Sequence, residues 1–225
     1  MAPVVGGPGT APDSAGATGA GRGARPDRRE QILVAADQVV AEEGFSAVSV
    51  RTVAARAGIG ASTLRYWFPS QDDLVTALAR RRVDPFLDDR RIADAAVPPV
   101  ERLAECLAQL LPAAEADRPV LEDWAALLST AVGPHATPLG RALYAGGQQS
   151  VAARVRAWLD VLVAEGALPA GRVPTAVPAL LTRADGLALG LLPGGAVPDL
   201  ATALAVLRAD VEALLRRPDV ATADP

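Results

Sequence analysis

The sequence predicts an all-α protein, and three observations lead to that prediction. Stretches rich in Ala, Leu and Val, each long enough for a helix, recur along the 225 residues and are separated by Pro or Gly pairs. The alternation of polar and apolar residues that marks a strand is sparse. A glycine-containing break at 58–60 separates two short helical patterns, as in a helix-turn-helix. We expect about nine helices: an N-terminal three-helix domain containing the helix-turn-helix, a connecting fourth helix, and a C-terminal antiparallel bundle.

The predicted boundaries follow changes in composition. Residues 1–24 consist mainly of Gly, Ala, Pro, Ser and Thr, and they bury too little surface to order themselves, so a disordered tail is expected. Residues 25–84 form the helix-turn-helix domain with its connecting helix, 85–217 the helical bundle, and 218–225 a second disordered tail. An alternative for the start of the chain is a basic arm that contacts phosphates or the minor groove, built from Arg22, Arg25, Arg28 and Arg29.

Residues 27–43 are predicted to form the first helix. Its apolar positions recur at helical spacing and make one stripe: Ile32, Ala35, Ala36, Val39 and Val40. Gly44 followed by apolar Phe45 is a typical helix stop. We expect this helix to support the helix-turn-helix through a shared core made of Ile32, Val39, Phe45, Leu64 and Phe68.

The two helices of the helix-turn-helix are short and have clear ends. Ser49 can cap the first, and Gly58 can supply the left-handed residue that ends it. In the second, residues 61–68, Leu64 and Phe68 point to one side. The opposite side carries donors and acceptors that suit base edges and phosphate oxygens: Ser62, Thr63, Arg65 and Tyr66.

A fourth helix is expected from Ser70 to about Val83. Pro69 stops the helix before it, and Asp73 lies three residues after Ser70, the spacing of a capping box. Asp72 and Asp73 also suit the positive N-terminal end of the helix dipole.

The run from Gly58 to Leu74, with its Ser62-Thr63-Leu64 and Tyr66-Trp67-Phe68-Pro69-Ser70 segments, resembles the DNA-binding signature of the TetR family of one-component transcriptional regulators. Residues 28–36 and 44–45 resemble the first helix of that family. The resemblance covers about residues 25–80 and three successive helices, so it is more specific than helix-turn-helix spacing alone. It implies that double-stranded DNA is contacted by Arg51, Thr52, Ala61, Ser62, Thr63, Arg65, Tyr66, Trp67 and Gln71.

Two residues depart from the family pattern. Gln71 stands where the family commonly has a lysine that contacts phosphate, and it can donate a hydrogen bond but carries no charge. Arg65 stands where an aromatic residue is common, so the target sequences of relatives do not carry over. An arginine here can read guanine through O6 and N7, with roughly 1–3 kcal/mol of discrimination, or can contact phosphate alone. The sequence leaves both roles open.

The net charge of −4 does not exclude nucleic acid, because the charges are unevenly distributed. Residues 22–84 carry 10 arginines and 8 acidic residues, whereas residues 85–225 carry 12 arginines and 17 acidic residues. The segment that resembles a DNA-binding domain is therefore mildly basic, and its binding to DNA should weaken as salt rises.

Five helices are predicted in the second domain, at 98–113, 117–132, 138–166, 174–192 and 198–217. Gly146-Gly147, inside the third of them, either kinks one helix or ends it and starts another. Pro178 lies one turn after Pro174. Its position favours a start of the helix predicted at 174–192 nearer Thr175 to Pro178.

The last two predicted helices carry more apolar surface than one chain is expected to hide. A dimer also suits DNA reading, because one two-turn helix spans too few base pairs, whereas a two-fold dimer reads both half-sites of a palindrome. Residues 184–189 also resemble the penultimate helix of TetR-type C-terminal domains. We therefore expect a homodimer interface that contains Leu187, Leu191, Leu204, Leu207 and Val211.

The family resemblance implies that the C-terminal helices surround a cavity for a small-molecule effector. Aromatic side chains with polar tips suit the wall of such a cavity, and ordinary core packing is their alternative role. The candidate wall residues are Trp124, Leu128, Tyr144 and Trp158. This apolar lining favours a hydrophobic or amphipathic effector.

The sequence offers no pattern typical of an enzyme, a metal site or a cofactor site. His135, the one histidine, lies in a predicted loop without a second histidine or a nearby cysteine at metal-ligand spacing. Cys106, the one cysteine, lies on an apolar helix face and is expected to be buried. No run of about 18 apolar residues could span a membrane, and the N-terminus lacks the order of a secretory signal, so a cytoplasmic protein is expected.

The sequence therefore predicts a ligand-responsive transcriptional regulator. Its simplest form is a repressor that binds a palindromic operator as a homodimer and is released by a small molecule, although an activator would have the same architecture. The alternative is a helical ligand-binding or protein-interaction module without specific DNA binding, which the uncharged Gln71 and the weak positive charge of residues 22–84 favour.

Overall fold

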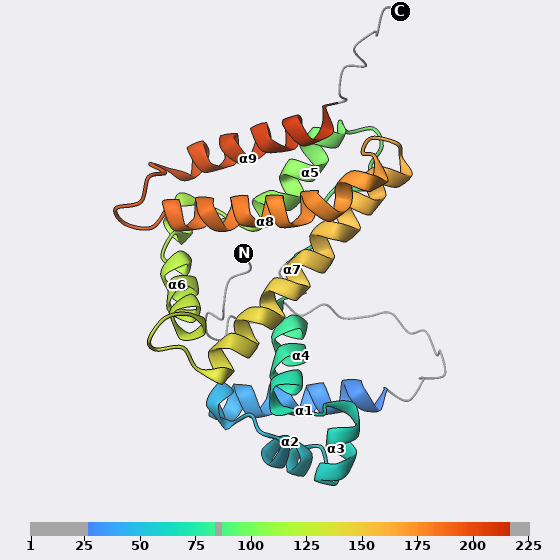
Figure 1. Ribbon diagram of the computed structural model, residues 1–225, viewed down its shortest axis with the longest axis vertical. Coiled ribbons are helices and arrows are strands. Elements are labelled where there is room, and N and C mark those ends of the chain that lie inside the picture. The colour runs from blue at the N-terminus through green and yellow to red at the C-terminus, as the bar shows by residue number, and fades with distance from the viewer. Residues whose placement is uncertain (1–26, 84–86, 217–225) are drawn as a thin grey trace, which may run out of the picture. The chain divides into compact units, whose positions relative to one another are not determined.

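The computed structural model describes residues 27–83 and 87–216, and every regular element in these ranges is a helix (Figure 1). The α-helices are α1 (Arg28–Glu43), α2 (Val50–Arg56), α3 (Ala61–Trp67), α4 (Gln71–Val83), α5 (Pro99–Ala108), α6 (Val120–Ala131), α7 (Pro138–Ala164), α8 (Val173–Gly190) and α9 (Leu200–Leu215). Short 3-10 helices are η1 (Phe45–Ala47), η3 (Glu115–Asp117) and η4 (Ala170–Arg172). The all-α prediction is confirmed. The predicted tails, 1–24 and 218–225, lie outside the described residues.

Contacts divide the described chain into two compact units. The N-terminal unit contains residues 27–81 and 127–146, and the C-terminal unit contains the described residues of 82–126 and 147–216. The division falls inside α6 and α7, and also near the end of α4, so each of these helices contributes to both units. Grouping by contacts thus places 127–146 with the helix-turn-helix, whereas the predicted functional division lies at residue 84.

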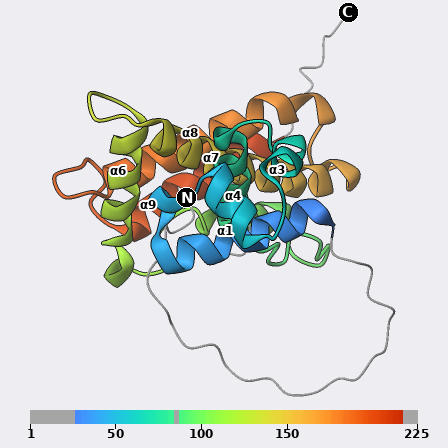
Figure 2. The same cartoon turned by 90° about the horizontal axis from the view of Figure 1, so that it is seen from below.

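The N-terminal unit is built around one apolar core, and α1, α3 and α4 gather around it (Figures 1 and 2). The residues predicted to join the first helix to the helix-turn-helix all belong to this core. Phe45 is half-buried against it, and the fully buried ones are Ile32, Val39, Leu64 and Phe68. The predicted support of α3 by α1 is confirmed.

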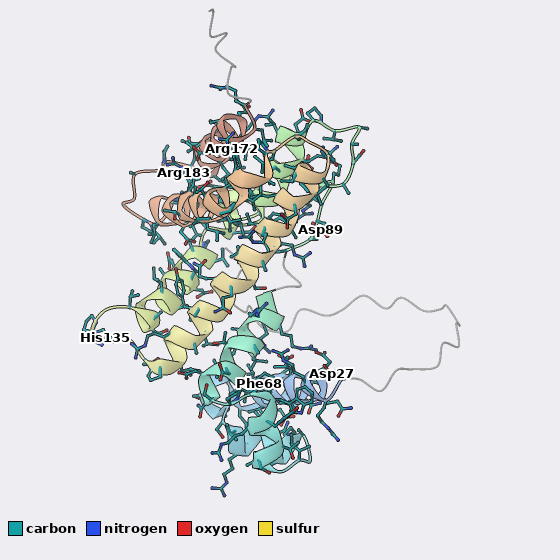
Figure 3. All side chains as sticks on the ribbon, turned by 45° about the vertical axis from the view of Figure 1, so that its right-hand side comes forward. Asp27, Phe68, Asp89, His135, Arg172 and Arg183 are labelled. Atoms are coloured by element: carbon teal, nitrogen blue, oxygen red, sulfur yellow. The ribbon has the colours of Figure 1, made fainter. Side chains whose placement is uncertain are left out.

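Side-chain caps fix where the helices of the N-terminal unit begin. Asp27 accepts a hydrogen bond of 3.3 Å from the amide two residues on, at the start of α1 (Figure 3). Ser49 and Thr52 cap α2 reciprocally, with amide-to-hydroxyl bonds of 3.0 and 3.1 Å. Ser70 and Asp73 do the same for α4, and both of their amide bonds are 3.0 Å long. The predicted capping box at Ser70 is therefore present.

Helix α7 passes through Gly146-Gly147 as one continuous helix of 27 residues, so the alternative of two separate helices is wrong. Glycine is needed at 146 because a Cβ atom there would overlap the Thr76 carbonyl oxygen of α4. A Cβ atom on Gly140 would overlap the Thr130 carbonyl oxygen of α6 in the same way. Both glycines permit close helix packing within the N-terminal unit.

In the C-terminal unit, α9 packs against α5 and α8 (Figure 1). The apolar core of the C-terminal unit contains residues of α5, α7, α8 and α9. They include Leu103, Leu107, Leu159, Leu162, Leu187, Ala188, Leu207 and Val211. A buried arginine forms an ion pair in this unit: Arg102 of α5 is 1% exposed and donates to Glu165 Oε1 at 3.0 Å and to the Ile92 carbonyl. The hydrogen bond from Arg102 lowers the pKa of Glu165.

Helix α8 begins at Val173, and the expectation that it begins nearer Thr175 to Pro178 is wrong. Pro174 lies in the first turn, where its missing N–H removes no helical hydrogen bond. Pro178 lies inside the helix and removes one backbone hydrogen bond from a helix of 18 residues. That single loss does not end the helix.

Candidate nucleic-acid interface

The turn between α2 and α3 determines how α3 is presented. Gly58 has a φ of 64°, a left-handed conformation that favours glycine, and it follows the last turn of α2. The Ile59 amide then donates to the Ala54 carbonyl at 3.0 Å, and Gly60 precedes α3. This geometry confirms the predicted break at 58–60.

Helix α3 is held by one face and exposed on the other. Leu64, in the middle of the helix, is buried, and so is Phe68, which directly follows the helix. The side chains predicted to face away from the core are all exposed: Ala61, Ser62, Thr63, Arg65 and Tyr66. The seven residues of α3 therefore place one guanidinium, two aliphatic hydroxyls and one phenol on a single surface.

Tyr66 and Trp67 take different positions at the end of α3. Tyr66 is 80% exposed, whereas Trp67 is half-buried and packs against the core of the N-terminal unit. The two rings meet edge to face, with centroids 5.4 Å apart. Trp67 thus supports the Tyr66 ring, and Tyr66 is the better placed of the two for an external contact.

Thr52 and Gln71 are tied to backbone atoms inside the N-terminal unit. The Thr52 hydroxyl donates to the Ala47 carbonyl at 2.7 Å, so its proton is used there. Gln71 Nε2 donates to the Val48 carbonyl at 3.1 Å and joins the start of α4 to the segment before α2. Both side chains position the helix-turn-helix, and the second amide hydrogen of Gln71 stays available because that residue is exposed.

Two arginines near the helix-turn-helix are held by carboxylates. Arg56 of α2 pairs with Glu42 at 2.7 Å and with Glu43 at 3.5 Å. Arg81 of α4 pairs with Asp37 at 2.6 Å and with Glu30 of the same first helix. These hydrogen bonds raise the pKa of both guanidinium groups. Arg56 and Arg81 therefore connect helices.

Arg51 and Arg65 differ from that pair. Both side chains are exposed, and neither takes part in an ion pair or a side-chain hydrogen bond within 27–83 and 87–216. Arg51 lies on α2 and Arg65 on α3. The helix-turn-helix itself thus carries two free guanidinium groups, which suit phosphate oxygens or base edges.

The predicted basic arm is only partly described. Arg22 and Arg25 lie outside the described residues. The Arg29 guanidinium carbon lies 5.0 Å from the centroid of the Phe68 ring, a cation–π contact. Arg28 donates to Gln31 at 3.0 Å. Arg29 thus covers the residue that anchors the end of α3.

Comparison with known proteins identifies this helix-turn-helix. The model of the bacterial regulatory proteins of the tetR family matches residues 32–78, from within α1 to within α4. The helix-turn-helix segment of the chain is thus similar to that of the TetR family. The chain is 35% identical to the HTH-type transcriptional regulator PksA of Bacillus subtilis over 107 residues. These residues cover 46% of this chain and 51% of PksA. The chain is 40% identical to the HTH-type transcriptional repressor KstR of Mycobacterium tuberculosis over 86 residues. These residues cover 37% of this chain and 38% of KstR.

The chain thus spans about half the length, or less, of these relatives. A fold comparison reaches further. A crystal structure of a TetR-family transcriptional regulator from Rhodococcus sp. matches 84% of this chain and 98% of that chain, with a TM-score of 0.50 and 20% sequence identity. At that identity the match establishes the TetR-type fold.

The residues predicted to line an effector site fall in both units of the chain. Trp124 and Trp158 are buried in the C-terminal unit, and Leu128 and Tyr144 are half-buried in the N-terminal unit. Trp158 Nε1 donates to Asp89 Oδ1 at 2.9 Å, so its polar tip already has a partner.

Sequence reasoning missed a carboxylate within the C-terminal unit. Asp185 of α8 is half-buried and accepts a hydrogen bond of 3.1 Å from Gln148 of α7. Burial raises the pKa of Asp185, because the charged form is poorly solvated there. A signal was present in the sequence: Asp185 is the one acidic residue of α8.

The predicted dimer residues divide into two groups. Leu204 of α9 is 36% exposed, and Leu189 of α8, which is not one of the five, is 45% exposed. The other predicted residues are buried within the single chain: Leu187, Leu191, Leu207 and Val211. Of the five, only Leu204 has its side chain available to a partner in this structure.

His135 and Cys106 lie where the sequence places them. His135 is exposed in the loop between α6 and α7 (Figure 3). Cys106 is buried in α5, and burial raises the pKa of its thiol to about 12, so the thiol is un-ionised at neutral pH. In the part of the chain that the structure describes, no helix is long and apolar enough to cross a membrane.

Proposed function

We propose that this chain is a cytoplasmic, homodimeric transcriptional repressor that binds a palindromic DNA operator and is released by a small molecule. The observation that carries the proposal is the exposed polar face of α3, held in place by buried Leu64 and Phe68. That arrangement lies within the residues that match the TetR-family model.

The dimensions of α3 support insertion into DNA. Seven residues at about 1.5 Å each give a helix of roughly 10 Å, which suits a major groove about 12 Å wide. Hydroxyl, phenol and guanidinium groups on its exposed face match the donors and acceptors of base edges and phosphates. The free Arg51 on α2 adds a cation for the DNA backbone.

A dimer follows from the small size of this reading surface. One short helix contacts too few base pairs for specificity, whereas two copies related by two-fold symmetry read half-sites roughly 34–36 Å apart or a multiple of that spacing. The exposed Leu189 and Leu204 support an interface on α8 and α9. An interface that also used Leu187, Leu191, Leu207 or Val211 would need these side chains to leave the core.

Release by an effector requires a ligand that prefers the state with low DNA affinity. Suppose that the states with low and high DNA affinity are present at about 1:99 without ligand. A ligand that changes this ratio to about 99:1 must bind the low-affinity state about ten-thousand-fold more tightly, a difference in binding free energy of about 5.5 kcal/mol. The buried aromatic side chains of Trp124 and Trp158 support a hydrophobic or amphipathic effector, and Asp185 adds one polar group in the same unit. KstR, a similar protein, carries the name of a repressor, which supports repression as the outcome.

Selection of bound duplexes from a random DNA pool tests the proposal. The purified full-length protein is incubated with the pool at two salt concentrations, and the bound sequences are determined. A palindrome enriched at both concentrations is the expected result, and its sequence supplies the operator for ligand screening. No enriched sequence, or binding that disappears with salt regardless of sequence, would contradict the proposal.

The alternative is a helical ligand-binding or protein-interaction module without specific DNA binding. The internal hydrogen bond of uncharged Gln71 and the mild charge of residues 22–84 favour it. Replacing Arg65 and Tyr66 together by Ala separates the two functions, because both side chains are exposed and their loss leaves the core intact. Unchanged DNA binding in this double variant would exclude α3 as the reading helix.

A further inference from the structure

One exposed side chain of α3 can identify a base pair through two parallel hydrogen bonds. The hydroxyls of Ser62, Thr63 and Tyr66 both donate and accept, so each matches several base edges. Arg65 carries a planar fork of N–H donors, which matches the N7 and O6 acceptors of guanine in the major groove. Bidentate reading by α3 can therefore come only from Arg65 among its exposed side chains.

The Arg65 fork is not used within the chain. Arg65 has no ion pair or side-chain hydrogen bond among the described residues, whereas Arg56 on the neighbouring helix is held by Glu42 and Glu43. Helix α3 contains no acidic residue that could compete for the guanidinium. The fork is therefore available to an external acceptor pair.

The residue one turn before Arg65 leaves it room to extend. Side chains on a helix tilt towards its N-terminus, so Arg65 lies over Ala61, four residues earlier. Ala61 is exposed and presents only a methyl group. A long arginine side chain can extend past that methyl group towards the floor of a groove about 8.5 Å deep.

Arg51 carries the other free guanidinium group of the helix-turn-helix, and its place suits contact with the DNA backbone. In such motifs the second helix lies in the major groove, and the first crosses the DNA backbone. Arg51 lies on α2, the first helix, and is thus placed for phosphate, whereas Arg65 lies on α3, the second. From this placement we propose that each operator half-site contains a guanine that Arg65 reads through N7 and O6. This inference depends on the DNA binding proposed above.

Repeated selection with variants of the full-length protein tests it. Arg65→Gln is expected to replace the guanine by adenine at one position of each half-site, because an amide pairs with adenine N6 and N7. The other positions of the palindrome should keep their preferences. Arg51→Ala, the control, is expected to weaken binding to all sequences while leaving the base preferences unchanged.

A second measurement uses the unmodified protein, so it does not depend on how a variant folds. An operator with 7-deazaguanine at the selected position of one half-site lacks the N7 acceptor but keeps O6. Its affinity for the unmodified protein is expected to fall about 2- to 10-fold, part of the discrimination that a full bidentate contact gives. For Arg65→Ala, the normal and modified duplexes should bind equally.

The outcomes separate this inference from the proposed function. If the unmodified protein enriches no palindrome, both are wrong. If it enriches a palindrome but Arg65→Gln keeps the same base preferences, or 7-deazaguanine has no effect, Arg65 does not read guanine and the DNA-binding function stands.

Discussion

Arg51 and Arg56 lie five residues apart on α2, yet only Arg56 has carboxylate partners. The difference comes from α1, whose last residues include Glu42 and Glu43. The sequence shows both arginines but not this pairing, because it depends on how α1 and α2 pack. The sequence alone could therefore list Arg51 and Arg65 as candidates without showing that they are the free ones.

Replacing Arg51 by Ala is expected to weaken operator binding and to make it less sensitive to salt. If Arg51 contacts one phosphate in each half-site, the slope of log affinity against log salt concentration falls by about 0.9 per contact, or roughly 1.8 for a dimer. Fluorescence anisotropy of a labelled operator, titrated at several salt concentrations, measures this slope. Arg56→Ala is the matched control on the same helix, and its slope should equal that of the unmodified protein. A slope that is the same in Arg51→Ala would place Arg51 away from phosphate.

Asp185 is expected to make the stability of the folded chain depend on pH. Burial raises its pKa above the ordinary value of 3.8, so the folded chain binds this proton more tightly than the unfolded chain. The resulting contribution to stability is present at low pH and is lost as pH rises from about 4 through the raised pKa. Asp185→Asn keeps an oxygen for Gln148 but removes the titration.

Urea unfolding of both proteins at several pH values between 4 and 7 measures the effect. The free energy of unfolding of Asp185→Asn minus that of the unmodified protein should increase as pH rises across this window. A constant difference between the two would show that Asp185 has an ordinary pKa in the folded chain.

At the scale of the helices, local signals predicted the ends well and the packing poorly. Ser49 and Ser70 were predicted as caps, and both caps are present, because a cap is formed by residues close in sequence. Gly146 was predicted to mark a kink or a break, yet α7 continues through it. Its role is to admit the Thr76 carbonyl of another helix, a contact between distant residues that the pattern of one helix does not contain.

Gly146→Ala is expected to destabilise the fold by about 1–3 kcal/mol, the usual cost of overpacking, because the new methyl group meets backbone atoms of α4. Gly186→Ala is the matched control in α8. A Cβ atom there meets nothing within 4 Å, so the better helix propensity of Ala should stabilise the fold by about 0.5–1 kcal/mol. Denaturant unfolding at a fixed protein concentration compares the two. Equal effects in the two variants would contradict the close contact at Gly146.

At the scale of the whole molecule, periodicity identified which helices are strongly apolar but not which side each residue faces. Leu187, Leu207 and Val211 were predicted for an interface between chains, and they lie in the core of one chain. A helix that is apolar around much of its circumference supplies a core and an interface with the same residue types. Exposure separates these two roles, and it leaves Leu204 as the predicted residue that a partner can reach.

Leu204→Glu is therefore expected to weaken the homodimer and, with it, binding to the palindromic operator. Placing a carboxylate without a partner in an apolar interface should raise the dimer dissociation constant by about tenfold or more. Sedimentation velocity at several protein concentrations measures dimerisation, and an operator titration measures the consequence for DNA. Val132→Glu is the matched control, because Val132 is 55% exposed and lies outside α8 and α9. If both variants remain dimers of equal strength, the interface lies elsewhere. If Leu204→Glu becomes monomeric and still binds the full palindrome with unchanged affinity, the two-fold mode of DNA reading is wrong.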